Sequence, residues 1–454
     1  MASIGLVGWG VETQSAYRYF GPDNDYLIVN EEPRDDFPTQ SDRVKVQFIN
    51  QNRQPGVTSN VSDLSYLDGV EACDQIIYTP TVVKNLEQKF GNDQKFWHKT
   101  TTVQHLFFEQ SPTKNIIGVT GSKGKGTTST LIAKMLEAAG HRVFLGGNIG
   151  QSPLDFLRQL TPDSWVVLEL ASFQLYKFPF SPHIAVCLMI SREHMDWHSD
   201  MGEYTETKAN LFKHQSSDDI AIYFAGDENS HKIAESSPGK KLAYFQKPGA
   251  FVKNSTIVVG DEETEVVKTA ELKLMGGHNW QNVCAAITAV WQVSQDVVAM
   301  RKVLTSFSGL EHRLEFVKEV NDVKYYDDSF ATTPEASSVA LVAFQQPIVL
   351  IAGGWDKGLD MSPLIDQIAR KGRLVRHVVL IGQIAPQMAQ KLKQNAFTAV
   401  TEGLTEMPAI VAEARARAQP GDVVLLSCGT SSFGLFKDYK DRGNKFKEAV
   451  RALA

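Results

Sequence analysis

The sequence is poor in cysteine, has no long apolar run and carries no excess of positive charge, and each absence excludes a class of protein. Its four cysteines are far apart and lack Cys-x-x-Cys spacing, which argues against a disulfide framework and a zinc site and favours a reducing, cytoplasmic location. No stretch approaches ~18 uninterrupted apolar residues, and no basic segment precedes the apolar N-terminus. Neither membrane spanning nor export is expected.

The net charge and the length of the chain limit its expected partners and its number of domains. The 46 Lys and Arg residues against 52 Asp and Glu give a net charge of −6, so a nucleic-acid partner, which needs a broad positive field, is not expected. At about 150 residues per domain the chain suggests roughly three domains, and its 43% apolar residues suffice for a core in each. Polar or glycine-containing stretches at 110–115 and 307–310 place the expected domains at 1–111, 112–305 and 306–454.

Short β-branched runs alternate with longer helical patterns along the whole chain. This alternation predicts an α/β fold with parallel sheets. The expected strands lie at 4–7, 26–29, 115–120, 165–170, 184–190, 220–224, 323–326, 347–352, 378–381 and 423–426.

A glycine-rich loop follows one of these strands and opens a helix. Its glycines allow successive backbone N–H groups to point at one anion, and the helix N-terminus adds partial positive charge. Lys125 is expected to reach terminal phosphate oxygens, and Thr127 to supply the hydroxyl for Mg²⁺ because Gly126 occupies the usual position. The alternative is a glycine turn with a solvated lysine. The predicted nucleotide loop comprises Gly121, Ser122, Lys123, Gly124, Lys125, Gly126 and Thr127.

Two further polar side chains follow predicted strands. Glu169 ends the strand at 165–170, and His194 follows the strand at 184–190. Because the carboxyl ends of parallel strands meet at one edge of a sheet, both are expected beside Lys125. Each alone would more often be structural, but together they favour a metal–nucleotide site.

These motifs, taken in order, resemble those of the Mur ligases over nearly the whole chain. The matching elements are Gly-Val-Thr-Gly-Ser-Lys-Gly-Lys at 118–125, Gly-Gly-Asn-Ile-Gly at 146–150, Leu-Glu-Leu-Ala-Ser-Phe-Gln-Leu at 168–175, Glu-His-Met-Asp at 193–196, Tyr-x-x-x-Lys at 204–208, His-Asn-x-x-Asn at 278–282, Gly-Leu-x-His-Arg at 309–313, Asp-Ser-x-Ala-Thr at 328–332, Leu-Ser at 426–427 and Arg-Gly-Asn at 442–444.

The resemblance implies three domains: a Rossmann-like N-terminal domain for a UDP substrate, a central P-loop ATPase domain with a mostly parallel sheet, and a Rossmann-like C-terminal domain for an amino acid. It implies a cytoplasmic, monomeric ligase of peptidoglycan precursor synthesis. The expected reaction adds D-glutamate to UDP-N-acetylmuramoyl-L-alanine with ATP through an acyl phosphate.

The resemblance also assigns roles to single residues. Glu169 and His194 would help bind two Mg²⁺ ions, and Lys208 resembles the lysine that the family carbamylates. Without the resemblance, Lys208 would be a helix-surface lysine. The remaining assignments are the adenine for Asn279, for which a helix N-cap is the alternative, the γ-phosphate for Arg313 and the ribose for Asp328.

Substrate residues follow from the same resemblance. Thr332, Lys357, Ser432 and Tyr439 would contact glutamate, while Gly10 and Asn148 would contact the UDP substrate. Glu12 and the run at 30–32 fall where the family contacts uracil, and the turn at 79–82 falls near the pyrophosphate. The chain departs from the family where Phe330 and Thr333 replace a lysine and an asparagine, and again at 428–434.

These departures keep other functions open. The missing lysine at Phe330 makes L-glutamate or another amino acid an alternative acceptor. Together with Gly126, it also leaves open a non-catalytic nucleotide-binding protein. A third reading is an NAD-dependent oxidoreductase, because Gly8 and Gly10 follow a strand and Glu31 lies 21 residues further on. Thr13 stands where the third glycine of that motif belongs, and the reading gives Lys125 no role.

Overall fold

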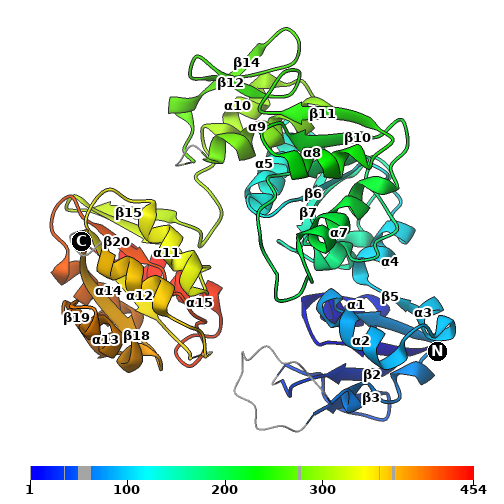
Figure 1. Ribbon diagram of the computed structural model, residues 1–454, viewed down its shortest axis with the longest axis horizontal. Helices are drawn as coiled ribbons and strands as arrows, with labels where there is room; N and C mark the ends of the chain where they lie inside the picture. The colour runs from blue at the N-terminus through cyan, green and yellow to red at the C-terminus, as the bar shows by residue number, and fades with distance from the viewer. Residues whose placement is uncertain are drawn as a thin grey trace. The chain divides into compact units, whose positions relative to one another are not determined.

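The computed structural model describes residues 2–34, 36–49, 63–274, 278–356, 358–370 and 374–453. Lys357 therefore lies outside the described residues. The described chain forms two compact units, the first ending at Phe307 and the second beginning at Ser308 (Figure 1). Each unit has its own sheets and apolar cores.

The first sheet of the first unit is entirely parallel, with strand order β3-β2-β1-β4-β5. Its strands are β1 (Ser3–Val7), β2 (Asp25–Asn30), β3 (Val44–Phe48), β4 (Gln75–Tyr78) and β5 (Thr100–Thr101). The accompanying helices are α1 (Val11–Phe20), α2 (Val83–Phe90), α3 (Gln94–His98) and α4 (Val103–Gln110). The glycine turn at Gly8 and Gly10 joins β1 to α1, as expected for a Rossmann-like unit.

A second parallel sheet follows, with strand order β11-β10-β9-β6-β8-β7. Its strands are β6 (Ile116–Thr120), β7 (Val143–Gly147), β8 (Trp165–Glu169), β9 (Ile184–Cys187), β10 (Ile220–Phe224) and β11 (Lys240–Tyr244). Its helices are α5 (Lys125–Ala138), α6 (Pro153–Leu157), α7 (Met201–Lys213), α8 (Glu228–Glu235), α9 (His278–Trp291) and α10 (Val297–Leu304). Strand β6 is wholly buried and lies between β8 and β9. The loops after these three strands therefore share one edge of the sheet.

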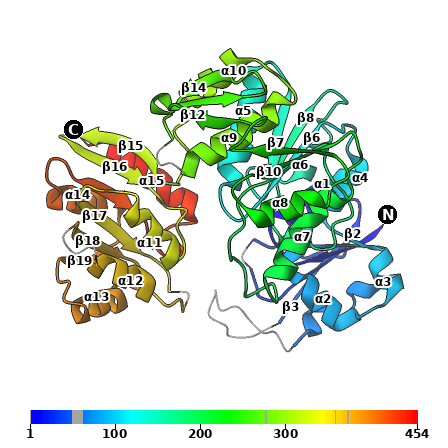
Figure 2. The same cartoon turned by 45° about the horizontal axis from the view of Figure 1, so that its top comes forward.

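A small antiparallel sheet was not expected from the sequence. Strands β12 (Phe251–Lys253), β13 (Thr256–Val259) and β14 (Thr264–Lys268) lie beside α9 and α10 (Figure 2). The β12–β13 turn is Asn254-Ser255, and both residues have positive φ, which is the geometry of a two-residue hairpin turn. Because the second residue is serine rather than glycine, the sequence carries only a weak hairpin signal.

The second unit contains one mixed sheet of order β15-β16-β20-β17-β18-β19, in which only β15 is antiparallel to its neighbour. Alternate strand residues pack on opposite faces, against α11 to α13 on one side and α14 and α15 on the other. The strands are β15 (Glu315–Val320), β16 (Val323–Asp327), β17 (Ile348–Gly353), β18 (Val375–Ile381), β19 (Val400–Leu404) and β20 (Val423–Leu426). The helices are α11 (Pro334–Val342), α12 (Ser362–Arg370), α13 (Ala385–Gln394), α14 (Met407–Arg417) and α15 (Tyr439–Arg451). The predicted α/β class is confirmed.

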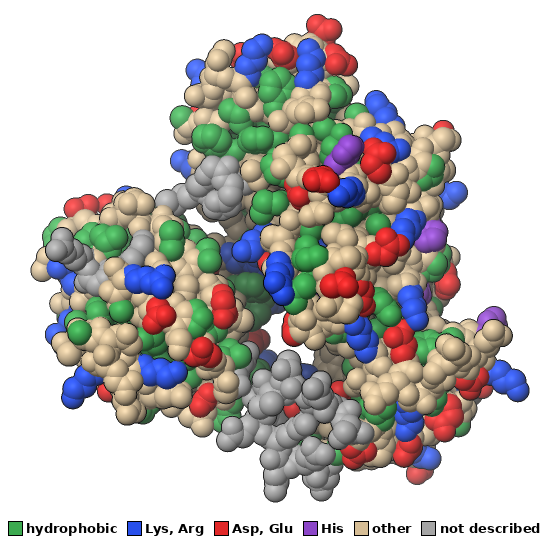
Figure 3. Space-filling model, in the orientation of Figure 1, with side chains coloured by type: hydrophobic (Ala, Val, Ile, Leu, Met, Phe, Trp, Pro, Cys, Tyr) green, Lys and Arg blue, Asp and Glu red, His purple; other side chains and the backbone are tan. Residues whose placement is uncertain are grey.

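Charged side chains of both signs are interspersed over each unit on the face shown in Figure 3. Within the described ranges, every helix is too short or too polar to cross a bilayer.

Candidate functional site

The phosphate loop joins buried β6 to α5, which begins at Lys125. Gly124 is the N-cap with φ +87°, a left-handed conformation that glycine adopts without a Cβ penalty. The ammonium of Lys125 donates to the carbonyl oxygens of Gly121 at 3.0 Å and Ser122 at 2.7 Å. The lysine therefore folds over its own loop, where the helix N-terminus also directs backbone N–H groups. This geometry suits an anion, which the sequence predicts at this loop.

Ser122 joins the phosphate loop to the loop after β9 and to α7 through hydrogen bonds. Its hydroxyl donates to the carbonyl of Ser191 at 2.9 Å and lies 2.9 Å from the hydroxyl of Tyr204, while the backbone N–H of Ser191 donates to it at 2.8 Å. Lys123 is exposed and Gly126 is buried, whereas Thr127 is half-buried in the first turn of α5. Sequence reasoning missed Tyr204 and Ser191 as loop partners because nothing in their local pattern indicates this contact.

Glu169 ends β8, next to β6, and is buried with 4% of its surface exposed. The side-chain amide of Asn148 donates to its carboxylate at 2.9 Å, and the backbone N–H of Asn148 donates to its carbonyl at 2.8 Å. Asn148 was predicted to contact the UDP substrate, and the structure places it against Glu169. A buried carboxylate with lone pairs left for a cation suits Mg²⁺.

His194 lies in the loop after β9, on the other side of β6. Burial lowers the pKa of its imidazole, and the positive charges of Lys125 and Lys208 lower it further against the opposing effect of Glu193. The lowered pKa favours the neutral imidazole, the form that binds a metal ion. Its backbone has φ +57°, an uncommon conformation for a residue with a side chain.

Lys208 is not the surface lysine that its sequence context alone suggests. It lies on α7 with 1% of its surface exposed. Its ammonium donates to the carbonyl of Gly121 at 3.0 Å and lies over the ring of Tyr204, 4.6 Å from the centroid. Burial, followed by the charge of Lys125, lowers its pKa to about 7. The lowered pKa leaves more of this amine uncharged at neutral pH than in an exposed lysine, and the uncharged form is the reactive one.

Helix α9 approaches the same loop. It begins at His278, so Asn279 is a first-turn residue rather than the N-cap considered above. The amide of Asn282 donates to the side-chain oxygen of Asn279 at 3.0 Å. A Cβ placed on Gly124 would lie only 2.1 Å from the side-chain oxygen of Asn282. Asn282 therefore packs directly on the phosphate loop, although the sequence analysis gave it no site role.

In the second unit, Asp328 follows β16 and is buried. Its carboxylate accepts hydrogen bonds from the hydroxyl of Ser427 at 2.7 Å and the backbone N–H of Leu314 at 3.2 Å. Burial raises its pKa to about 7, against the opposing effect of these hydrogen bonds. Arg313 precedes Leu314, and its guanidinium carbon lies 3.8 Å from the ring centroid of Phe330. Asp328 and Arg313 thus belong to one cluster.

Of the residues predicted for the amino acid, Tyr439 contacts this cluster through Phe330. Tyr439 begins α15, and its ring meets Phe330 edge-on at 5.2 Å. Thr332 is half-buried in the turn after Phe330. Ser432 is buried in the 428–434 loop, which contacts Trp355 through the backbone of Ser431 at 2.9 Å. The loop that departs most from the family is therefore a packed part of this unit.

The glycine turn of the first sheet faces the 79–82 turn. A Cβ on Gly10 would lie 3.2 Å from the methyl group of Thr79. Thr13 is buried and accepts a hydrogen bond from the backbone N–H of Gly10 at 3.1 Å, so it closes the turn where a third glycine was missing. Glu12 was expected at the uracil. Its carboxylate accepts hydrogen bonds from the amides of Gln104 and, at 2.6 Å, Gln174, and burial raises its pKa.

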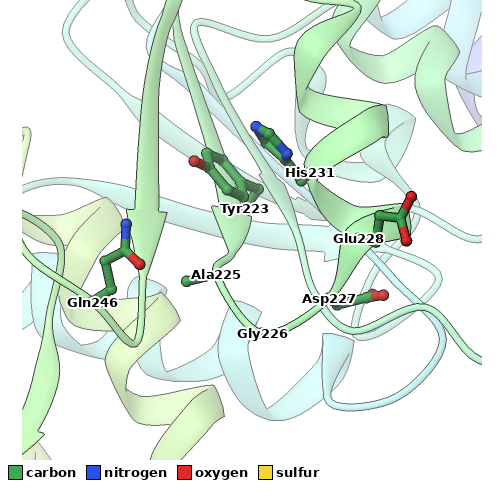
Figure 4. A pocket seen from close by; sticks show the side chains of 7 residues that line it. All are labelled: Tyr223, Ala225, Gly226, Asp227, Glu228, His231 and Gln246. Atoms are coloured by element: carbon green, nitrogen blue, oxygen red, sulfur yellow. The ribbon is translucent and has the colours of Figure 1, made fainter.

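Two cavities lie elsewhere in the first unit. One of about 410 Å³ is open at the end of β10 and the start of α8, where the rings of Tyr223 and His231 stack at 4.7 Å (Figure 4). Asp227 on its wall accepts a hydrogen bond from the backbone N–H of Ile190 at 2.6 Å and so supports the fold. A second, of about 560 Å³, is lined partly by Tyr78 and Trp97. Neither is lined by a predicted site residue.

Comparisons with known proteins agree with this organisation. The model of the Mur ligase middle domain matches residues 119–290, and that of the Mur ligase glutamate ligase domain matches residues 312–429. A UDP-N-acetylmuramoylalanine--D-glutamate ligase of Acetivibrio thermocellus is 36% identical over 401 residues, covering 86% of this chain and 84% of that protein. A ligase of the same name from Symbiobacterium thermophilum is 38% identical, covering 75% of this chain and 76% of its own length.

Solved structures support the fold. The UDP-N-acetylmuramate-alanine ligase MurC of Thermotoga maritima aligns over 100% of both chains with a TM-score of 0.58 and 17% identity. The MurF ligase of the same organism, solved in complex with ADP, aligns over 99% of this chain and 95% of its own with a TM-score of 0.55 and 16% identity.

Proposed function

The chain belongs to the Mur ligase family, and from this premise we propose that it is an ATP-dependent ligase that adds D-glutamate to UDP-N-acetylmuramoyl-L-alanine. The observation that carries the proposal is the convergence of Lys125, Glu169, His194 and Lys208 at one sheet edge of a chain that is 36% identical to named D-glutamate ligases over most of its length.

The chemistry needs an activated acid, because a carboxylate is a poor electrophile with a poor leaving group. A carboxylate oxygen of the L-alanyl group attacks the γ-phosphorus of ATP, ADP leaves, and an acyl phosphate forms. The amine of glutamate then attacks the carbonyl carbon and loses a proton, and phosphate departs with the former carboxylate oxygen. Lys125 and Arg313 offset the charge on the transferred phosphoryl group, and orientation supplies much of the remaining acceleration.

Mg²⁺ fits the donor set at the sheet edge. Glu169 offers a buried carboxylate, His194 an imidazole and Thr127 a hydroxyl in the first turn of α5. These residues would hold the ion, which supplies further positive charge to the phosphate oxygens when bound.

We propose that Lys208 is carbamylated. Carbon dioxide reacts with a neutral amine, and the lowered pKa of about 7 provides that form. The nitrogen bonds to the carbon of CO₂ and loses a proton to solvent, which leaves a carbamate anion whose two oxygens could serve as ligands for a second Mg²⁺. It would also replace a buried positive charge next to Lys125 with a negative one.

Further proposals concern substrate positions. Asn279 and Asp328 would contact the adenine and ribose, Gly10 and Asn148 the UDP substrate, and Thr332, Ser432, Tyr439 and Lys357 the acceptor. All these residues belong to one chain, so we propose a monomer. Four buried unpaired cysteines and a requirement for ATP favour the cytoplasm.

The test supplies ATP, Mg²⁺ and UDP-N-acetylmuramoyl-L-alanine with either D- or L-glutamate, and weighs the product by mass spectrometry. We expect product with the D-enantiomer and transfer of oxygen-18 from the substrate carboxylate to phosphate. Product with L-glutamate alone would reassign the acceptor. Absence of product with both would contradict the proposal and favour a non-catalytic nucleotide-binding protein.

A further inference from the structure

Phe330 is a half-exposed aromatic residue of the second unit that contacts Arg313 and Tyr439. It lies in the turn between β16 and α11, with 40% of its surface exposed. One contact is the guanidinium of Arg313 at 3.8 Å from its ring centroid, the closest cation–ring approach among the described residues. Another is the ring of Tyr439, at 5.2 Å and nearly perpendicular. The ring of Phe330 therefore packs against Tyr439, while the guanidinium of Arg313 lies over it.

The backbone that carries Arg313 is held on both sides. Its neighbours His312 and Leu314 both have positive φ, at 62° and 45°, an uncommon conformation for residues with side chains. The carbonyl of His312 accepts a hydrogen bond from the backbone N–H of Phe330 at 3.0 Å, and the N–H of Leu314 donates to Asp328. Such conformations persist only where surrounding contacts enforce them, and they cluster at functional sites.

A buried pair strengthens this hold. The imidazole Nδ1 of His312 lies 2.7 Å from a carboxylate oxygen of Asp327, and both side chains are buried. The 312–314 segment is thus fastened to the 327–330 turn through backbone and side chains. The side chain of Arg313 extends from this fixed backbone, and the ring of Phe330 that lies against its guanidinium restricts its rotamers.

We propose that Phe330 is a positioning residue that holds the guanidinium of Arg313 ready for a phosphoryl group. Stacking engages the flat face of the guanidinium, whereas an anion is bound by N–H groups along its edge, so both contacts are possible together. Pre-ordering the side chain lowers the entropy lost when the phosphate binds. This inference rests on the proposed function, in which Arg313 serves the γ-phosphate.

The experiment is a double-mutant cycle on the full chain with Phe330→Leu, Arg313→Ala and the double variant. Binding of a non-hydrolysable ATP analogue with Mg²⁺ is measured by calorimetry, and kcat and both KM values by product formation. Since an exposed cation–π contact is modest, Phe330→Leu should weaken nucleotide binding or raise KM for ATP about two- to five-fold. It should have no further effect when Arg313 is already alanine. Phe330→Tyr, which keeps the ring, should restore wild-type values.

Controls separate this role from a structural one. Phe316 is a comparably exposed phenylalanine of the same unit, and Phe316→Leu should leave nucleotide binding unchanged. Equal effects of Phe330→Leu with and without Arg313 would overturn the proposal. So would a change confined to KM for glutamate, or no change at all. Product formation by the unmodified protein tests the proposed function separately. If no product forms, the nucleotide-binding measurements of the double-mutant cycle still test the role of Phe330.

Discussion

The ammonium of Lys208 donates a hydrogen bond of 3.0 Å to the carbonyl oxygen of Gly121, so that a buried lysine of α7 is joined to the first glycine of the phosphate loop. The two residues are 87 positions apart in the sequence. The contact places an amine with a lowered pKa beside Lys125, whose own ammonium donates to the same carbonyl at 3.0 Å. Both lysines donate to one carbonyl oxygen, so their positive charges lie close together. A bound anion, or a carbamate on Lys208, would reduce the repulsion between them.

Replacement of Lys125 by alanine should reduce kcat by about 10²- to 10³-fold, the usual cost of removing one group that stabilises transition-state charge. The fold should survive because the lysine is a half-buried residue at the first position of α5 and its side chain is not part of an apolar core. Lys134→Ala, which removes an exposed lysine from the same helix, is the matched control. Steady-state kinetics and a thermal melt measure both effects. Unchanged kcat in the Lys125 variant would remove its catalytic role.

Carbamylation of Lys208 can be observed directly. Protein equilibrated with carbon-13 bicarbonate should give a carbamate signal by NMR, and Lys208→Ala should lose both the signal and most of the activity. Added bicarbonate should not restore activity to this variant, whereas a short carboxylic acid should do so partly by supplying an anion. Lys213→Ala on the same helix should keep the signal. A signal that survives in the Lys208 variant would assign it to another amine.

Gly124→Ala should weaken nucleotide binding and lower stability. The substitution places a Cβ at φ +87° and 2.1 Å from the side-chain oxygen of Asn282. Left-handed geometry alone costs about 1–2 kcal/mol. Gly140 has φ +89° with nothing within 4 Å of its Cβ position, so Gly140→Ala isolates that backbone cost. Urea denaturation and nucleotide titration of both variants should give a larger loss at position 124. Equal losses would show that Asn282 yields to the new methyl group.

Asp328 should make the stability of the second unit depend on pH. Its pKa is raised from 3.8 to about 7, so the folded state binds a proton more tightly than the unfolded state. The stabilisation is complete below about pH 4 and is lost as the pH rises through about 7, at about 1.4 kcal/mol for each pH unit between the two pKa values. Asp328→Asn, which mimics the neutral acid, should flatten this slope in denaturation measured from pH 4.5 to 7.5. Asp366→Asn, an exposed carboxyl on α12, should leave the slope unchanged.

Much of the architecture was predictable because it is encoded over short distances. The phosphate loop has its strand, glycines and helix within 25 residues, and β6 ends at Thr120 as expected, although α5 begins at Lys125, inside the predicted loop of 121–127. Strand β9 ends at Cys187, earlier than the expected 190, since its continuation turns away to bond with Ser122. The antiparallel sheet β12–β13–β14 was missed because its turn lacks glycine and its strands are short.

The sequence alone therefore determined the alternation of strands and helices and the glycine loop that turns N–H groups toward an anion, because backbone preferences act between neighbouring residues. Only the tertiary structure decided that Lys208 is buried, that Glu12 is bound by two glutamine amides and that Arg313 lies on Phe330. Burial and pKa depend on which distant segments pack around a side chain, and no local pattern records them.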